Sequence, residues 1–335
     1  MKLIRLLLLP IVPIYFAITW FRNLFYDLGY KSSKSYAFPV LCVGNLSAGG
    51  TGKTPMVEYL IRLLKDDFKL ATLSRGYGRK TKGFRLANAA TTALEIGDEP
   101  FQFYHKFKDD ILVSVDENRQ HGIEILRALK NKPEVVVLDD AFQHRKVKAG
   151  FNILLTTYNK PFYSDFVLPT GDLREPKNGA KRAQVIVVTK CPETISKLEK
   201  DNIISKIKPK PYQKVFFSSI SYSEFVISNS KKIALQDVQS FTLVTGIANA
   251  KPLVSFLNKK QLKFNHLEFK DHYNFSALDI ERFAKETLII TTEKDFVRLK
   301  DYSELSDNLY YLPITVSIDN TKDFNTSILN FIKRF

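Results

Sequence analysis

The sequence predicts an α/β fold, in which a doubly wound parallel sheet is followed by a second, smaller α/β domain. From about residue 35 onward, short continuous apolar runs alternate with helix-like segments. Continuous runs are typical of parallel strands that helices cover on both faces, whereas strands with one solvated face alternate apolar and polar residues. The length of 335 residues suggests two domains, since a domain usually has about 100 to 200 residues.

The first domain is predicted from six apolar runs and the segments between them. Strands are expected at residues 40–43, 69–73, 111–115, 135–138, 151–156 and 185–188. Helices are expected at residues 55–64, 100–107 and 120–130. This alternation of strands and helices is the pattern of a doubly wound sheet.

A lysine-rich stretch at residues 197–214 is the expected boundary of this domain. After it, we expect a strand pair at 212–220 and 223–227, strands at 241–244, 264–269, 288–291 and 309–312, and helices at 250–259 and 277–283. The predicted organisation is an N-terminal helix at 1–30, the first domain at 31–211, a strand-pair linker at 212–240 and the smaller α/β domain at 241–335.

Composition excludes several protein classes. With 44% hydrophobic and 25% charged residues, the chain is neither disordered nor of low complexity. Fifty Lys and Arg residues against 35 Asp and Glu residues give a net charge of +15. This charge favours an anionic partner: a nucleic acid, an acidic membrane surface or a phosphorylated substrate. Cys42 and Cys191 are too few for a disulfide framework, so a reducing compartment is expected.

The beginning of the chain is strongly apolar. Residues 6–21 form a run of 16 residues without a charge. This run is shorter than the roughly 20 apolar residues that cross a bilayer, and prolines disturb a spanning helix; Pro10 and Pro13 lie within it. We therefore predict a membrane-associating helix in the lipid interface, whose anchors are Trp20, Tyr15, Phe21 and Phe25. A helix buried against the protein and a cleaved signal peptide are the alternatives.

The strongest local motif is VLCVGNLSAGGTGKT at residues 40–54, an apolar run followed by a glycine-rich turn and then a helix. Glycines let backbone N–H groups surround a phosphate, and the helix N-terminus adds a partial positive charge. The lysine of such a loop reaches the β- and γ-phosphates, and the Thr hydroxyl ligates Mg²⁺. A P-loop NTPase-like fold that binds a nucleotide is therefore predicted, with a loop formed by Ser47, Ala48, Gly49, Gly50, Thr51, Gly52, Lys53 and Thr54.

Three positions depart from familiar versions of this site. Ser47 stands where G-x-x-x-x-G-K-[ST] has its first glycine, so a glycine-rich turn without a nucleotide is the alternative. Ala48 replaces the signature lysine of dimeric switch ATPases, so catalysis through a partner's lysine is not expected. Thr189 and Lys190 lie where guanine-specific proteins carry [NT]-K-x-D, but Pro192 replaces the aspartate, and guanine specificity is not supported.

A second motif, VVVLDD at residues 135–140, ends an apolar run in two acids. An acid at the end of a buried strand commonly holds the Mg²⁺ of a bound nucleotide. Asp139 is the expected ligand of the metal or of its water, and Asp140 could tune or share that role. The alternative is that the pair only caps the following turn.

Several further segments accompany these motifs in a specific order. They are SRGYGRK at 74–80, GDEP at 97–100, LDDAFQHR at 138–145, LPTGDLREP at 168–176, DHY at 271–273 and TTEKDFVRL at 291–299. Together with NLSAGGTGKTP, this series resembles the tetraacyldisaccharide 4′-kinase family of lipid A biosynthesis, from the apolar N-terminus to about residue 299. No single segment carries the resemblance, but the ordered series is highly specific.

The resemblance implies transfer of the ATP γ-phosphoryl group to the 4′-hydroxyl of a tetraacylated glucosamine disaccharide 1-phosphate, which gives the 1,4′-bisphosphate. ATP and Mg²⁺ are the implied cofactors. The acylated disaccharide and the membrane surface are the implied partners, at the cytoplasmic face of the inner membrane. Neither a nucleic acid nor an obligate protein partner is expected.

The resemblance also implies roles for single residues. Asp98 matches the family's proposed general base, and His272 matches the histidine thought to pair with it. A sugar hydroxyl is a poor nucleophile, so a carboxylate that accepts its proton assists the transfer. Lys53 is expected to stabilise the developing charge, Arg174 to lie near the phosphates, and Glu175 to lie in the shell of the metal.

Each of these roles has a structural alternative. Asp98 could only cap its helix, His272 could be a loop hydrogen-bonder, and Arg174 and Glu175 could form a surface ion pair. The basic loop at residues 74–85 could hold a phosphate or lipid headgroups, or it could be a solvated loop. For the whole protein, the alternatives are a membrane-associated NTPase switch without a lipid acceptor and a basic nucleic-acid-binding ATPase.

Overall fold

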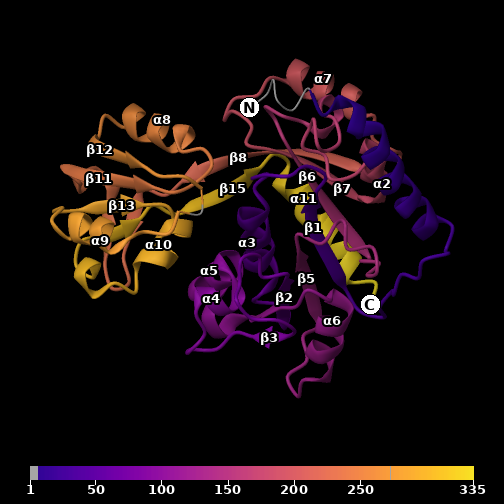
Figure 1. The fold of residues 1–335 in the computed structure, drawn as a ribbon, viewed down its shortest axis with the longest axis horizontal. Helices are drawn as coiled ribbons and strands as arrows, with labels where there is room; N and C mark the ends of the chain where they lie inside the picture. The colour runs from indigo at the N-terminus through magenta and orange to yellow at the C-terminus, as the bar shows by residue number, and fades with distance from the viewer. Residues whose placement is uncertain (1–6, 272) are drawn as a thin grey trace.

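A computed structural model of the chain describes residues 7–271 and 273–335. In this part of the chain, two α/β lobes form, each around a sheet of its own (Figure 1). Two neighbouring strands of the larger sheet, β8 (Lys214–Tyr222) and β15 (Ile314–Ile318), extend toward the smaller lobe (Figure 1). The lobes are therefore joined through one edge of the larger sheet.

The larger sheet has nine strands within the described residues, in the order β15-β8-β7-β6-β1-β5-β2-β4-β3. Neighbouring strands from β8 to β4 are parallel, whereas β15 and β3 are antiparallel edge strands. The other bounds are β1 (Val40–Asn45), β2 (Leu70–Ser74), β3 (Arg85–Leu86), β4 (Leu112–Val115), β5 (Val135–Asp139), β6 (Phe151–Thr157) and β7 (Val185–Thr189). All six strands predicted for the first domain are present, and the predicted parallel sheet is confirmed.

Apolar helices cover both faces of this sheet. On one face, Leu60 and Phe324 are buried with Val43 of β1. On the other face, Ile123 is buried with Leu73 of β2. The helices of this lobe are α3 (Lys53–Leu64), α4 (Ala93–Ile96), α5 (Asp98–Phe107), α6 (Arg119–Ala128), α7 (Lys197–Ile207) and α11 (Thr321–Ile332). Because cores form on both faces, the predicted doubly wound arrangement is confirmed.

The smaller lobe has a sheet in the order β10-β9-β14-β13-β11-β12. Strands β14, β13, β11 and β12 are parallel, and β9 and β10 are antiparallel additions. The bounds are β9 (Phe225–Ile227), β10 (Lys232–Ala234), β11 (Ser240–Thr245), α8 (Lys251–Lys259), β12 (Lys263–Glu268), α9 (Ala277–Ala284), β13 (Ile289–Thr291), α10 (Glu293–Leu299) and β14 (Leu309–Tyr311). Short 3-10 turns lie at Leu9–Ile11, Lys108–Asp110, Phe162–Ser164, Lys177–Arg182, Leu235–Asp237 and Ser303–Leu305.

The division between the lobes differs from the prediction in two ways. The expected strand pair does not form, because β8 joins the larger sheet and β9 joins the smaller one. Phe216 and Phe217 of β8 are buried on opposite faces of the larger sheet, which fixes this strand there. The predicted unit at 241–335 also ends early. Strand β15 pairs with β8, and Phe324 of α11 packs edge-on against Phe216.

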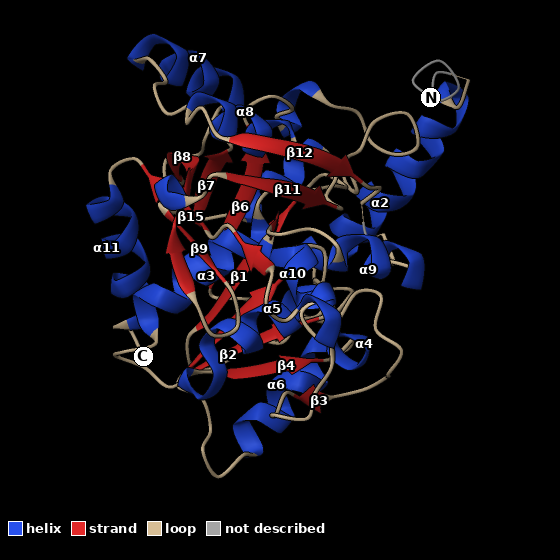
Figure 2. Cartoon of the chain, turned by 90° about the vertical axis from the view of Figure 1, so that its left-hand side faces the viewer, coloured by secondary structure: helices blue, strands red, loops and turns tan. Residues whose placement is uncertain are grey.

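The N-terminal helix α2 (Val12–Asp27) packs one side against the larger lobe, at the edge of the molecule in Figure 2. The Tyr15 hydroxyl donates to the carbonyl oxygen of Arg174 at 3.0 Å, and Arg22 donates to that of Gln143 at 2.8 Å. The prediction of Tyr15 as an interfacial anchor is therefore wrong, because its ring packs against the core of the larger lobe. The opposite side of the helix exposes a row of apolar side chains, Ile14, Ile18, Phe21 and Phe25. Across the described residues, no helix has both the length and the apolar character needed to traverse a bilayer.

Candidate active site

The predicted phosphate loop lies between β1 and α3, near the middle of the larger sheet. Its last glycine, Gly52, has a φ of +85°, a left-handed conformation that glycine adopts without steric cost. Helix α3 begins at the next residue. Lys53 and Thr54 therefore occupy the first helical turn, where backbone N–H groups and the helix dipole attract anions.

Side chains outside the loop fix its backbone. The Asn45 amide donates to the Thr51 hydroxyl at 2.7 Å. The Thr189 hydroxyl donates to the carbonyl oxygen of Thr51 at 2.8 Å, and Lys190 Nζ donates to that of Gly50 at 2.7 Å. Thr189 and Lys190 thus support the phosphate loop from the end of β7.

The first half of the loop is held by the segment at residues 168–176. The Ala48 N–H donates to the carbonyl oxygen of Asp172 at 2.6 Å, and Ser47 forms an antiparallel bridge with Leu173. Two motifs that are distant in the sequence are therefore adjacent in space.

Asp139 is the last residue of β5 and stands opposite Val43 of β1. The Ser74 hydroxyl donates to Asp139 Oδ2 at 3.2 Å, while the buried Oδ1 has no hydrogen-bond partner within the described residues. Burial, and then the charge of Asp140, raise the pKa of the Asp139 carboxyl to about 7. A buried carboxylate oxygen without a donor destabilises the protein unless a cation binds there.

Asp140 directs its carboxylate toward two basic side chains. Its Oδ1 lies 3.7 Å from Lys53 Nζ, and its Oδ2 lies 3.3 Å from Arg174 Nη1. Lys53, Asp139, Asp140 and Arg174, which the sequence analysis placed in one site, are therefore brought together by the fold.

Glu175 is 1% exposed, and both of its carboxylate oxygens accept hydrogen bonds. Oε1 accepts from Arg182 at 2.7 Å and from Gln143 at 3.0 Å, while Oε2 accepts from Asn23 of α2 at 2.7 Å. The alternative of a surface ion pair with Arg174 is wrong, because Glu175 is buried and each of these two residues has another charged partner. Glu175 connects the N-terminal helix with the segment that follows Asp140.

Asp98 is the first residue of α5, and its helix cap is Gly97, with a φ of +90°. The alternative in which Asp98 only caps this helix is therefore wrong. Its carboxylate forms an ion pair with Arg298 of α10, in the smaller lobe. The Asp98 side chain is 20% exposed and that of Arg298 is 13% exposed, so the pair is largely shielded from water. His272 lies outside the described residues, and its pairing with Asp98 stays a prediction.

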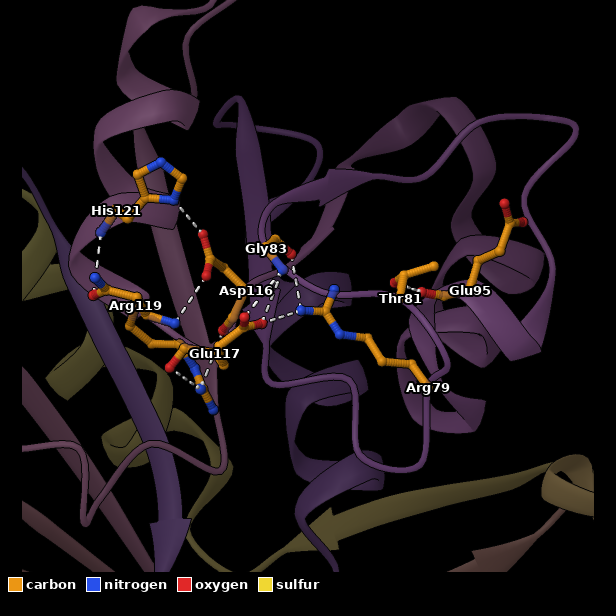
Figure 3. A network of polar contacts seen from close by, with 9 residues as sticks. Arg79, Thr81, Gly83, Glu95, Asp116, Glu117, Arg119 and His121 are labelled. Carbon is orange, nitrogen blue, oxygen red and sulfur yellow. Dashed lines mark hydrogen bonds and ion pairs between the residues drawn. The ribbon is translucent and has the colours of Figure 1, made fainter.

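The basic loop at residues 74–85 is anchored by an acid. Figure 3 shows Arg79 paired with the Glu117 carboxylate, which also accepts hydrogen bonds from the Gly83 N–H at 3.0 and 3.2 Å. The Arg79 side chain is 4% exposed, so the solvated-loop alternative does not hold for this residue.

A buried arginine, Arg119, belongs to the same network (Figure 3). Its guanidinium donates to the carbonyl oxygen of Asp116 at 3.2 Å. Burial lowers the pKa of Arg119, while the charges of Asp139 and Asp140 act in the opposite direction. Arg119 therefore supplies positive charge that interacts electrostatically with the two acids.

Comparison with known proteins identifies the family of the chain. The family model of the tetraacyldisaccharide-1-P 4′-kinases matches residues 4–333. The chain belongs to this family.

Individual members of the tetraacyldisaccharide 4′-kinase family are similar over nearly the whole chain. The tetraacyldisaccharide 4′-kinase of Flavobacterium johnsoniae is 48% identical, over 99% of this chain and 98% of the relative. The tetraacyldisaccharide 4′-kinase of Bacteroides fragilis is 46% identical, over 93% of this chain and 89% of the relative. The crystal structure of LpxK from Aquifex aeolicus in complex with ATP is 30% identical, with a TM-score of 0.80 over 98% of this chain and 99% of that one.

Membership confirms the predicted fold class, ATP dependence and reaction. The chain is an ATP-dependent kinase of lipid A biosynthesis whose acceptor is a lipid disaccharide, and Mg²⁺ is expected with its ATP.

Three residues of this kinase's site received no predicted role: Arg119, Gln143 and Arg298. Arg298 belongs to the segment TTEKDFVRL, which contributed to the resemblance, but its partner Asp98 is 200 residues away. Gln143 lies in LDDAFQHR in the same way. The ordered motifs therefore contained a signal for Gln143 and Arg298, but not for Arg119.

Proposed function

We propose that this kinase binds ATP at the phosphate loop and phosphorylates the 4′-hydroxyl of a tetraacylated glucosamine disaccharide 1-phosphate, with Asp98 as the general base. The observation that carries the site assignment is the buried Oδ1 of Asp139 beside that loop, which has no hydrogen-bond partner in the described part of the chain. A glycine-rich loop suits phosphates, and an unpaired carboxylate suits the cation that accompanies them.

The residues at this site fit Mg²⁺. Thr54, Asp139 and Asp140 would hold it through oxygen atoms, which are the ligands that Mg²⁺ prefers. When bound, Mg²⁺ neutralises charge on the β- and γ-phosphates. Three of the roughly four acceptor positions of Glu175 are in use. We therefore place this residue in the outer shell of the metal, where it orients its neighbours.

Lys53 and Arg174, the two basic side chains that pair with Asp140, are assigned to the phosphates. Lys53 stabilises the negative charge that develops on the transferring phosphoryl group, and Arg174 binds the phosphate oxygens. In the nucleotide-free protein, Asp140 keeps both side chains at the end of the sheet where the phosphates enter.

Asp98 accepts the proton of the 4′-hydroxyl as the sugar oxygen attacks the γ-phosphorus. The bond between the γ-phosphorus and the bridging oxygen breaks, and ADP leaves. His272 is assigned to orient the Asp98 carboxylate, as in other sites where a third group orients the base. Because α10 of the smaller lobe packs on α5, closure of the lobes would exclude water from the transfer.

Helix α2 supports a site of action at the membrane surface. Its outward side chains recur at helical spacing and form an apolar stripe, while its inward side is bonded to the larger lobe. We assign this stripe to the lipid interface at the cytoplasmic face of the inner membrane. Basic residues in a chain of net charge +15 suit both an anionic surface and a phosphorylated acceptor.

The test uses full-length protein with vesicles that contain anionic phospholipid, ATP, Mg²⁺ and the disaccharide 1-phosphate. Mass measurement of the lipid is expected to show the gain of one phosphoryl group. Asp98→Ala is expected to lower kcat by roughly 100-fold or more, with ATP affinity unchanged. A wild-type kcat in this variant refutes the base assignment. ATP hydrolysis that proceeds equally without the acceptor would support the NTPase-switch alternative.

A further inference from the structure

The segment TTEKDFVRL at residues 291–299 forms the end of β13 and all of α10. Its polar side chains contact four other parts of the protein. Glu293 pairs with Lys106, Lys294 with Asp271, Asp295 with the N–H of Gly246, and Arg298 with Asp98. This short helix is thus placed by specific polar contacts as well as by apolar packing.

Two of these contacts join the lobes, and one of them belongs to a buried cluster. Lys106 Nζ lies 2.6 Å from both Glu58 Oε2 of α3 and Glu293 Oε1 of α10. The Gln102 amide donates to Glu58 Oε1 at 2.8 Å and to Glu293 Oε2 at 3.3 Å. We call Glu58, Gln102, Lys106 and Glu293 the interlobe cluster.

The interlobe cluster is shielded from water, since Glu58 is 1% exposed and Glu293 is 8% exposed. Burial and the charge of Glu58 raise the pKa of the Glu293 carboxyl. Two buried carboxylates repel each other unless a cation lies between them, and Lys106 occupies that position. The geometry of the cluster therefore depends on the Lys106 ammonium group, which both lobes share, and Arg62 of α3 adds a second cation on Glu58, with Nη2 at 3.0 Å from Oε2.

The two interlobe contacts lie at opposite ends of an antiparallel helix pair. Asp98 and Lys106 are eight residues apart on α5, and their partners Arg298 and Glu293 are five residues apart on α10. At a rise of 1.5 Å per residue, these separations are about 12 and 8 Å along the helix axes. Two separated points fix both the position and the direction of α10 on α5.

We propose that Arg298 is a positioning residue for phosphoryl transfer: it orients the Asp98 carboxylate, and the interlobe cluster holds α10 in the register that this contact requires. The inference rests on the proposed role of Asp98 as the base. A guanidinium engages a carboxylate in a planar, directional arrangement, which leaves defined lone pairs for the proton of the acceptor.

The cluster also extends to the phosphate loop. Glu58 lies on α3, five residues after Lys53, so the helix that carries the phosphate-binding lysine belongs to the same connection. The interlobe cluster thus sets the base and its orienting arginine in register with the nucleotide.

A double-mutant cycle of kcat tests the proposal, with Asp98→Ala, Arg298→Ala and the combined variant at saturating ATP and acceptor. Arg298→Ala alone is expected to lower kcat about 30-fold, with KM for ATP within about twofold of wild type. In the Asp98→Ala background, the same change is expected to cost less than about threefold. Equal losses in both backgrounds would overturn the proposal, because Arg298 would then act on the substrate directly.

Further variants separate positioning from folding. Guanidinium ion added to the Arg298→Ala variant is expected to restore part of kcat. The Arg298→Lys variant is expected to have a kcat between those of wild type and Arg298→Ala. If neither result is seen, a role for the planar guanidinium group is contradicted. Glu293→Gln is expected to lower kcat severalfold at an unchanged KM for ATP. A wild-type kcat in this variant would refute the claim that the interlobe cluster holds α10 in the register that the contact between Arg298 and Asp98 requires. The matched control is Arg282→Ala, an exposed arginine of α9, with wild-type kinetics. The Asp98→Ala variant alone reports on the proposed base, so failure of that function is seen separately.

Discussion

Replacing Asp139 with asparagine is expected to stabilise the nucleotide-free protein at alkaline pH, although it removes a residue assigned to catalysis. The Asp139 carboxyl has a pKa of about 7 in the folded protein, against an ordinary value of 3.8. Between these values, the folded protein keeps a proton that the unfolded chain has released. The free energy of unfolding therefore falls as pH rises through this window and is level above it.

The magnitude follows from the same two values. A shift of one pKa unit corresponds to about 1.4 kcal/mol of unfolding free energy. Of the window between 3.8 and about 7, the range from pH 5 to pH 7 covers about two units. From pH 5 to pH 8, the wild-type protein is expected to lose about 2 to 3 kcal/mol of unfolding free energy through Asp139 alone. An asparagine amide does not ionise, so the Asp139→Asn variant lacks this contribution.

The assay is urea denaturation of both proteins at pH 5, 6, 7 and 8, with EDTA and without nucleotide. The difference in unfolding free energy between variant and wild type should grow with pH and then level off above pH 7. Asp307→Asn, which removes an exposed carboxylate of the smaller lobe, serves as the control. Parallel pH dependence in the wild-type and Asp139→Asn proteins would refute the reasoning that burial keeps this carboxyl protonated.

Three other changes test separate parts of the molecule. Lys106→Met removes the cation paired with the buried Glu293, while Arg62 still pairs with Glu58. Urea denaturation at pH 8 should show a loss of about 3 kcal/mol; an unchanged midpoint would contradict the buried cluster. Lys53→Ala should lower kcat by roughly 100-fold or more, measured by phosphoryl transfer at an unchanged melting temperature. Ile18→Asp should weaken vesicle binding in a flotation assay by about tenfold or more, whereas Leu278→Asp, a change at a still more exposed apolar residue of the smaller lobe, should not.

Much of the larger lobe could be predicted from its sequence, because its strands are buried on both faces. Strands of this kind appear as continuous apolar runs, and β1, β5 and β7 are buried along their whole length. Strand β15 was missed, since it lies at the edge of the sheet and only Ile318 is buried. Its pairing with β8 is a contact between residues about 100 positions apart, which local periodicity does not report.

In the candidate site too, local patterns could be predicted from the sequence, whereas contacts between distant residues could not. The phosphate loop and Asp139 could be predicted because each needs a local pattern, a glycine-rich turn before a helix or an acid after a buried strand. The partners of Asp98 and Glu175 could not, because Arg298 and Asn23 come from elements that only the folded chain brings near. Arg174 followed by Glu175 resembles a surface pair in sequence, yet the two side chains point to different partners.

Two costly features of this protein lie where the reaction needs them. Asp139 Oδ1, beside the phosphate loop, has no hydrogen-bond partner among the residues that the structure describes, and two buried glutamates meet at the interface of the lobes. Such groups lower the stability of the free protein, and natural sequences keep them where function requires them. The first is relieved when a cation binds, whereas the second is relieved by Arg62 on Glu58 and by Lys106 between the two glutamates. Ligand binding and lobe register are thus stabilised by the same kind of electrostatic compensation. This argues that the interlobe cluster is part of the catalytic design rather than an incidental contact.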